Sequence, residues 1–136
     1  VLIVPPGHEG GDRFASAVLA WDGKRAAARA LGDAVGLLEP GARVTVVSVG
    51  EDEAAYRRDH RDPVTQLSRH GFDASFRLLS ASRRGIAEAL VGAVGEAGAE
   101  ILVMGAYEHS KFSEDLIGGV TARVLRSAPC PVLMAH

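Results

Sequence analysis

The sequence predicts an α/β fold with a five-stranded parallel sheet in the order 3-2-1-4-5 and helices on both faces. Five short apolar runs alternate with segments whose apolar residues recur at helical spacing, a pattern typical of βαβ units. Right-handed crossovers between parallel strands then restrict the possible orders of the sheet. Two of the runs end at glycine-bearing turns, Asp22-Gly23 and Gly105, where a ligand can approach the backbone.

The five predicted strands are short and mostly apolar. Val44–Val49 is rich in β-branched residues, which favour a buried strand. Ala74–Leu79 alternates between apolar and polar residues, which indicates a strand at the edge of the sheet. The strands are expected at Ala15–Trp21, Val44–Val49, Ala74–Leu79, Ile101–Ala106 and Pro131–Ala135.

The four predicted helices have recognisable ends. Lys24–Leu38 carries one apolar stripe, and Pro40-Gly41 should stop it. Asp62 is a good N-cap before Pro63, which suits the first helical position, and Gly71 is a good C-cap. The helices are expected at Lys24–Leu38, Pro63–His70, Arg83–Ala97 and Val120–Ser127.

Residues 1–13 are expected to be an extra strand and a linker, and residues 14–136 the main domain. Val1–Val4 is wholly apolar, so we expect it to pair antiparallel with Pro131–Ala135, the outermost strand, whose open edge needs covering. The linker Gly7–Arg13 extends to about 23 Å at ~3.3 Å per residue. This reach is short for the edge of the same molecule, so pairing with a neighbouring chain is the alternative to pairing within one molecule.

Composition excludes several classes of protein. The chain has 136 residues, 47% of them apolar, and a net charge of −2. It has no basic excess for binding nucleic acid and no apolar run of the ~20 residues that span a membrane. Cys130 is the single cysteine, so no internal disulfide can form, and a cytoplasmic location is expected.

The order of the strands predicts where a ligand would bind. A doubly wound sheet binds ligands beyond the carboxyl ends of its strands, where the strand order reverses. In this sheet that point lies between the strand that ends at Asp22 and the strand that ends at Gly105. Gly118-Gly119 begins a helix, whose first N–H groups favour an anion.

Ala15 to His136 resembles the universal stress protein family. Its ATP-binding members carry a glycine, two residues, a glycine, nine residues, and then glycine and Ser or Thr. Gly105 matches the first glycine and Gly118 the third, and AWDG resembles the exit of the family's first strand, whose aspartate contacts the nucleotide. The resemblance implies a Rossmann-like fold of the adenine nucleotide alpha hydrolase kind. The nucleotide-binding residues that it implies are Trp21, Asp22, Val49, Met104, Gly105, Glu108, Gly118, Gly119, Val120 and Thr121.

Two departures from the family pattern weaken the expected ATP site. Glu108 occupies the position of the second glycine, and two like charges at ~4 Å repel by ~4 kcal/mol at an effective dielectric of ~20. Gly119 stands where Ser or Thr would offer a hydroxyl to phosphate, although Thr121 can replace it in part. ATP is therefore a doubtful ligand, and no other cofactor is expected.

The beginning of the chain resembles a junction in tandem members of the family. VLIVPP is similar to the segment that closes a first domain, so we expect this chain to be a second domain with the tail of a first attached. The implied partner is a second copy, or a sister domain in a pseudo-dimer, joined through the last strand.

No catalytic or metal site is predicted. The five histidines are scattered without metal-ligand spacing, and Glu108, His109 and Lys111 have no orienting partner in the sequence. We therefore expect a non-enzymatic stress-response or regulatory binding protein with a partly degraded nucleotide site. The alternatives are a competent ATP-binding member with slow hydrolysis, or a structural half of a pseudo-dimer.

Overall fold

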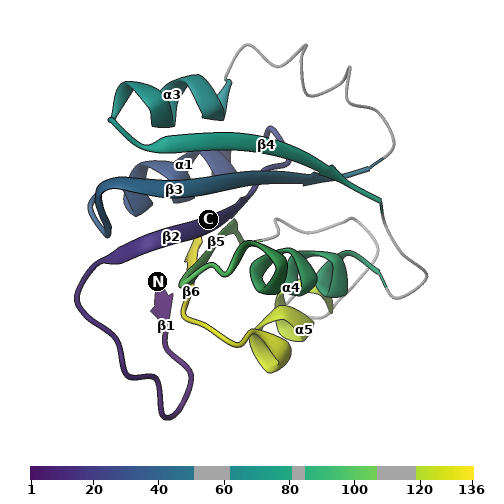
Figure 1. Ribbon diagram of the computed structural model, residues 1–136. Helices are drawn as coiled ribbons and strands as arrows, with labels where there is room; N and C mark the ends of the chain where they lie inside the picture. Colours follow the sequence, from purple (N-terminus) through teal and green to yellow (C-terminus); the bar gives the residue numbers. More distant parts are fainter. Residues whose placement is uncertain (51–61, 81–84, 107–118) are drawn as a thin grey trace.

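The computed structural model describes residues 1–50, 62–80, 85–106 and 119–136. They form a mixed sheet of six strands in the order β1-β6-β5-β2-β3-β4 (Figure 1). Strands β2 to β6 are parallel in the predicted order, whereas β1 pairs antiparallel with β6. The predicted count of five strands, all parallel, is therefore wrong by this one strand. The strands are β1 (Leu2–Ile3), β2 (Phe14–Ala20), β3 (Leu38–Val49), β4 (Asp73–Leu79), β5 (Ile101–Gly105) and β6 (Val132–Ala135).

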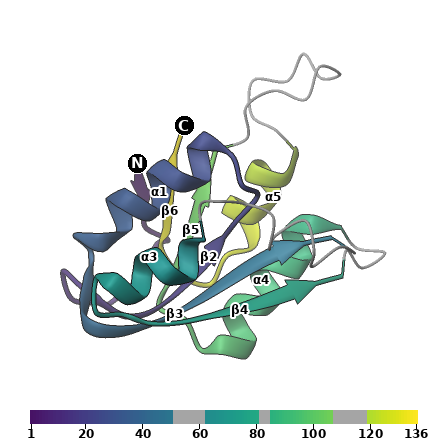
Figure 2. The same ribbon diagram turned by 90° about the horizontal axis from the view of Figure 1, so that it is seen from above.

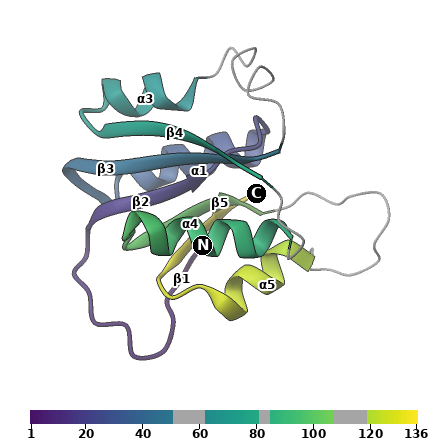
Figure 3. The same ribbon diagram turned by 45° about the vertical axis from the view of Figure 1, so that its right-hand side comes forward.

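Helices cover both faces of the sheet, as predicted. In Figure 2 the pair α1 and α3 lies on one side of the sheet, and the pair α4 and α5 lies on the other. Figure 3 shows α4 and α5 in front of the strands. The helices are α1 (Arg25–Val35), α3 (Pro63–Arg69), α4 (Ile86–Ala97) and α5 (Gly119–Ser127).

Each pair of helices packs on its own half of the core. Along β2, Leu19 joins the cluster under α1 and α3, whereas its neighbour Val18 joins the cluster under α4 and α5. Alternate residues of a strand point to opposite faces, so a strand buried on both faces is apolar throughout. This explains why the central strands appear in the sequence as continuous apolar runs.

The junction between α1 and β3 differs from the prediction. The helix was expected to reach Leu38, but it ends at Val35, and Leu38 already pairs with Phe14 of β2. Leu38 is the first residue of β3, and its side chain is buried. It contributes to the core as predicted, but from a strand rather than from the apolar stripe of the helix. Gly41 has a φ of +75°, and the pairing of β2 with β3 is irregular between Phe14 and Ser16. Pro40-Gly41 therefore lies within β3, in its irregular part.

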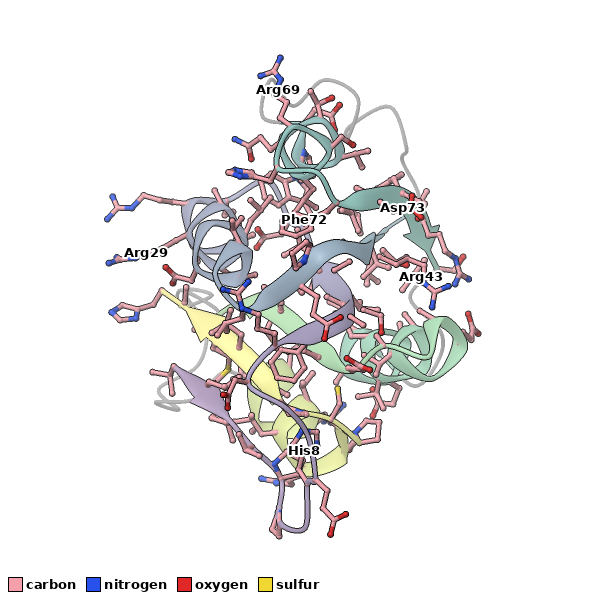
Figure 4. The ribbon with its side chains drawn as sticks, turned by 60° about the vertical axis from the view of Figure 1, so that its left-hand side comes forward. His8, Arg29, Arg43, Arg69, Phe72 and Asp73 are labelled. Atoms are coloured by element: carbon pink, nitrogen blue, oxygen red, sulfur yellow. The ribbon has the colours of Figure 1, made fainter. Side chains whose placement is uncertain are left out.

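The α3 helix begins as predicted. The Oδ1 atom of Asp62 accepts a hydrogen bond from the Val64 N–H at 3.0 Å, and its Oδ2 atom accepts one from the Thr65 hydroxyl at 2.6 Å. After the helix, Gly71 has a φ of +86° and turns the chain so that Phe72 is buried between α3 and the sheet (Figure 4). The strand that follows, β4, ends the sheet, which confirms that it is an edge strand.

The extra strand β1 pairs antiparallel with β6 of the same chain, as expected for Val1–Val4. Ile3 pairs with Val132 at the amino end of β6, and Phe14 opens β2 at the same edge of the sheet. The linker therefore crosses only three strand spacings, about 14 Å at ~4.8 Å each. This distance is less than the linker's reach of about 23 Å, so the linker is not too short for the β6 edge of its own chain.

Candidate functional site at the strand exits

The exits of β2 and β5 lie side by side, as the sequence predicts. These strands are parallel neighbours, with Leu19 paired to Val103. Continuing this register by two residues places Trp21 level with Gly105, so Asp22 and Gly105 occur at the same carboxyl edge. This is the point where the chain order of the sheet reverses, and it is where such sheets bind ligands.

The exit of β2 is fixed by hydrogen bonds from β3. The Trp21 N–H donates to the Val47 carbonyl at 2.8 Å, and the Ser48 hydroxyl donates to the Trp21 carbonyl at 2.7 Å. Asp22 is exposed, and its Oδ1 atom accepts a hydrogen bond from the Lys24 N–H at 2.9 Å. Gly23 has a φ of +73°, which allows this tight turn into α1. The Asp22 carboxylate is thus held at the surface by its own turn.

The side chain of Trp21 carries a feature that sequence reasoning missed. The indole is only 4% exposed and belongs to the core cluster under α1 and α3. Its Nε1 atom is the one buried side-chain N or O atom without a hydrogen-bond partner in the described part of the chain. A buried donor that lacks a partner destabilises the folded state. No local pattern in the sequence predicts this unpaired donor.

Gly105 is required for the packing of β5 against α1. A Cβ atom built at this position would lie 2.8 Å from the Ala27 nitrogen and 2.9 Å from the carbonyl carbon of Ala26. The backbone at the start of α1 therefore rests directly on the end of β5. A glycine cradle for phosphate was the interpretation from sequence, and the structure adds this second reason for glycine.

Val49 and Met104 lie at strand ends but turn toward the core. Met104 is 1% exposed and sits in the cluster under α4 and α5, so it can meet a ligand only through its main chain. Val49 is partly buried against the same cluster. Neither side chain offers polar chemistry to a ligand.

The start of α5 provides the last group of predicted site residues. Gly119 is exposed, and a Cβ atom placed there would have no atom within 4 Å. Val120 is partly buried and Thr121 is buried. Glu108 and Gly118, the other two predicted site residues of this segment, lie outside the described residues, as does the predicted anion site that includes the Gly118 amide.

The ionisable groups of the described residues show no further centre. No group of three or more His, Cys, Asp or Glu side chains in these residues could hold a metal ion. Cys130 is buried, and desolvation raises the pKa of its thiol, while a backbone hydrogen bond from Leu102 lowers it by less. Among the described helices, none is long and apolar enough to cross a membrane.

These observations define a doubly wound α/β domain with its candidate site at the topological switch point. Residues 14–136 match the model of the Universal stress protein family, so the chain belongs to this family. Its resemblance to that family is thereby confirmed. No curated protein matches the chain.

Solved structures share the fold at low sequence identity. A protein solved as hypothetical protein MJ0577 is 19% identical, with a TM-score of 0.73 over 88% of this chain and 94% of that chain. A universal stress protein in complex with cAMP is 23% identical, with a TM-score of 0.71 over 91% and 98%. UspA from Lactobacillus plantarum is 18% identical, with a TM-score of 0.70 over 93% and 100%.

Proposed function

We propose that this domain is a non-enzymatic regulatory binding protein of the cytoplasm whose adenine nucleotide site is weakened. The observation that carries the proposal is the meeting of Asp22 and Gly105 on neighbouring strand exits, at the switch point of the sheet. This is the place where a nucleotide would bind in a sheet of this kind. The complex of a family neighbour with cAMP supports an adenine nucleotide as the class of ligand to test.

The proposed weakness comes from two residues that depart from the family's glycine pattern, Glu108 and Gly119. Glu108 brings a carboxylate to a position that glycine occupies in ATP-binding members, and Gly119 lacks the hydroxyl that would contact phosphate. A triphosphate beside a carboxylate is repelled, and Gly119 supplies only its N–H group. We therefore expect weak or absent binding of ATP, with no hydrolysis.

The two departures can be reversed in the same variant. A Cβ atom at position 119 meets no atom within 4 Å, so Gly119→Ser adds a hydroxyl without displacing its described surroundings. Glu108→Gly removes the carboxylate. We expect the double variant to bind ATP with magnesium at micromolar affinity, and each single variant to bind more weakly.

Calorimetry with ATP and magnesium tests the proposal. The fluorescence of Trp21 gives an independent signal, because it is the one tryptophan of the chain and adjoins Asp22. Gly32→Ser is the matched control, since Gly32 is also an exposed helical glycine with open space at its Cβ. Tight binding by the unmodified chain would contradict the weakened site, and failure of the double variant would contradict the assignment of the two residues.

We also propose that β6 is the edge at which this domain meets a partner, either a second copy or the first domain of a tandem protein. Support comes from the position of β1, which pairs antiparallel with β6 as a strand from a preceding domain would. A domain whose main role is structural, as half of a pseudo-dimer, would use the same edge. Weak binding of a nucleotide by the unmodified chain would favour the regulatory role over a purely structural one, because a structural half needs no ligand.

A further inference from the structure

The indole N–H of Trp21 is a hydrogen-bond donor without an acceptor in the described part of the chain. The side chain is 4% exposed, and its Nε1 atom has no hydrogen-bond partner. Buried donors in folded proteins are nearly always paired, and an unpaired donor destabilises the state that buries it. The closed position of this side chain therefore lacks one hydrogen bond, which an acceptor from outside the chain can supply.

The main chain of Trp21 is fixed, whereas its indole is held by packing alone. The Trp21 N–H donates to the Val47 carbonyl at 2.8 Å, and the Trp21 carbonyl accepts from the Ser48 hydroxyl at 2.7 Å. The indole belongs to the apolar cluster under α1 and α3. A movement of the ring toward a ligand therefore breaks no hydrogen bond, because the exit of β2 keeps its bonds to β3.

The indole lies at the carboxyl end of its half of the core. Leu19 and Trp21 are the last two residues by which β2 and its exit contribute to the cluster, and Asp22, which follows, is exposed. Trp21 is also level with Gly105 in the register of the sheet, at the switch point where such sheets bind ligands. The unpaired donor thus belongs to the candidate site.

The surroundings of the indole favour an acceptor carried on an apolar body. A buried water needs about two to four polar partners, but the buried members of this cluster are apolar, and the Ser48 hydroxyl already donates to the Trp21 carbonyl. A phosphate would lose its hydration among apolar side chains, which is costly for a charged group. A flat heterocycle brings a ring nitrogen as acceptor and an apolar surface that replaces the contacts it displaces.

We propose that the Trp21 indole N–H recognises the base of a bound purine nucleoside by donating to one of its ring nitrogens. The inference rests on the proposed function, in which an adenine nucleotide binds at these strand exits, and it adds the donor that recognises the base. The carboxylate of Glu108 opposes a phosphate but not a base. The ligand class that suits the unmodified chain is therefore an uncharged nucleoside, and we expect adenosine to bind more tightly than ATP.

The single tryptophan of the chain gives a direct test. Its indole N–H produces one resonance in a nitrogen–proton correlation spectrum, which is followed while adenosine is added to the unmodified chain. We expect the proton resonance to move downfield as the hydrogen bond forms, and calorimetry gives the dissociation constant in parallel. Inorganic triphosphate, which has no base, should leave the indole resonance in place.

Analogues of adenosine identify the accepting atom. Each deazaadenosine replaces one ring nitrogen with a C–H group and so removes one acceptor while the shape of the base is kept. We expect one of these analogues to leave the indole resonance unmoved and to bind about tenfold more weakly than adenosine, the upper range for the loss of one hydrogen bond. Equal shifts with every analogue would contradict a ring nitrogen as the acceptor.

Trp21→Phe keeps an aromatic ring in the core and removes the donor. We expect adenosine to bind this variant about tenfold more weakly, with no remaining preference over the deaza analogue that the unmodified chain rejects. Phe72→Leu is the matched control, because Phe72 is buried in the same cluster but directly before β4, at the amino edge of the parallel strands (Figure 4). It should keep both the affinity and the preference. If Trp21→Phe does not fold, the spectra of the unmodified chain decide.

The outcomes separate this inference from the proposed function. Binding of adenosine with an unmoved indole resonance would overturn the role of Trp21 and leave the nucleotide site standing, which is also the result if a buried water is the partner of the indole. If adenosine does not bind, but ATP binds to the double variant Glu108→Gly and Gly119→Ser, the nucleoside is overturned as the ligand and the proposed function stands. Binding of neither ligand would overturn both.

Discussion

Gly105 at the end of β5 lies against Ala27 in the first turn of α1, so closely that a methyl group at position 105 would stand 2.8 Å from the Ala27 nitrogen. The two residues are far apart in the chain, and they fix the height of α1 above the sheet. The turn of Asp22 leads directly into this helix, so the same contact positions the Asp22 carboxylate relative to β5.

Gly105→Ala should destabilise the domain. The added methyl group meets backbone atoms of Ala26 and Ala27, which cannot move aside as a flexible side chain would. Overpacking of this kind costs about 1–3 kcal/mol, and urea unfolding would measure it. Gly119→Ala, where the new methyl group has open space, should leave the free energy of unfolding within about 0.5 kcal/mol. Similar values for the two variants would contradict the packing role of Gly105.

Ser48→Ala should loosen the exit of β2. The Ser48 hydroxyl donates to the Trp21 carbonyl at 2.7 Å, and losing one such hydrogen bond costs about 0.5–1.5 kcal/mol. Thermal unfolding gives the stability, and the emission of Trp21 reports any local change. Ser75→Ala on exposed β4 is the matched control and should change neither quantity. If both variants behave alike, the Ser48 hydroxyl does not hold the exit.

The thiol of Cys130 should make stability fall at high pH. Burial raises its pKa above the ordinary value of 9.0, so the unfolded chain releases this proton first as the pH rises. The unfolded state then binds fewer protons than the folded state, and the free energy of unfolding decreases above about pH 9. The difference in stability between the parent chain and Cys130→Ala should shrink between pH 8 and pH 10, as urea titrations at each pH would show. A constant difference would contradict the raised pKa.

The ion pair between Arg77 and Glu96 should contribute little to stability. Its atoms are 2.9 Å apart, but the side chains are 46% and 64% exposed. Exposed pairs contribute about 0–1 kcal/mol and are screened by salt. A double-mutant cycle with Arg77→Gln and Glu96→Gln should give a coupling energy in this range that falls in 1 M salt. A larger, salt-independent coupling would be unexpected for a surface pair.

Much of the fold could be predicted because its signals are local. Alternating strands and helices, the Asp62 cap and the apolar run of residues 1–4 each specify an element without reference to distant residues. The boundary near Leu38 was wrong because an apolar residue fits a helical stripe and a strand equally well. The choice depends on Phe14, a partner on another strand that no local pattern identifies.

The candidate site was predictable in position but not in detail. The strand order places Asp22 beside Gly105, and that relationship is confirmed. The packing role of Gly105 and the unpartnered Nε1 atom of Trp21 depend on side chains and backbone brought from other elements. Charge and spacing alone carry no information about such contacts.

The hydrogen bonds of Glu100 to Ala15 and Ser16 have a consequence for the order in which the chain folds. Glu100 accepts a hydrogen bond from the Ala15 N–H at 2.7 Å and donates its own N–H to Ser16, so the beginnings of β2 and β5 are joined across more than eighty residues. Strands β2, β3 and β4 can associate through nearer neighbours, whereas β5 must close a long loop, which is slow in proteins. Asp22 and Gly105 meet only when this loop closes. A fragment that ends before β5 would therefore lack the site, however well its three strands were formed.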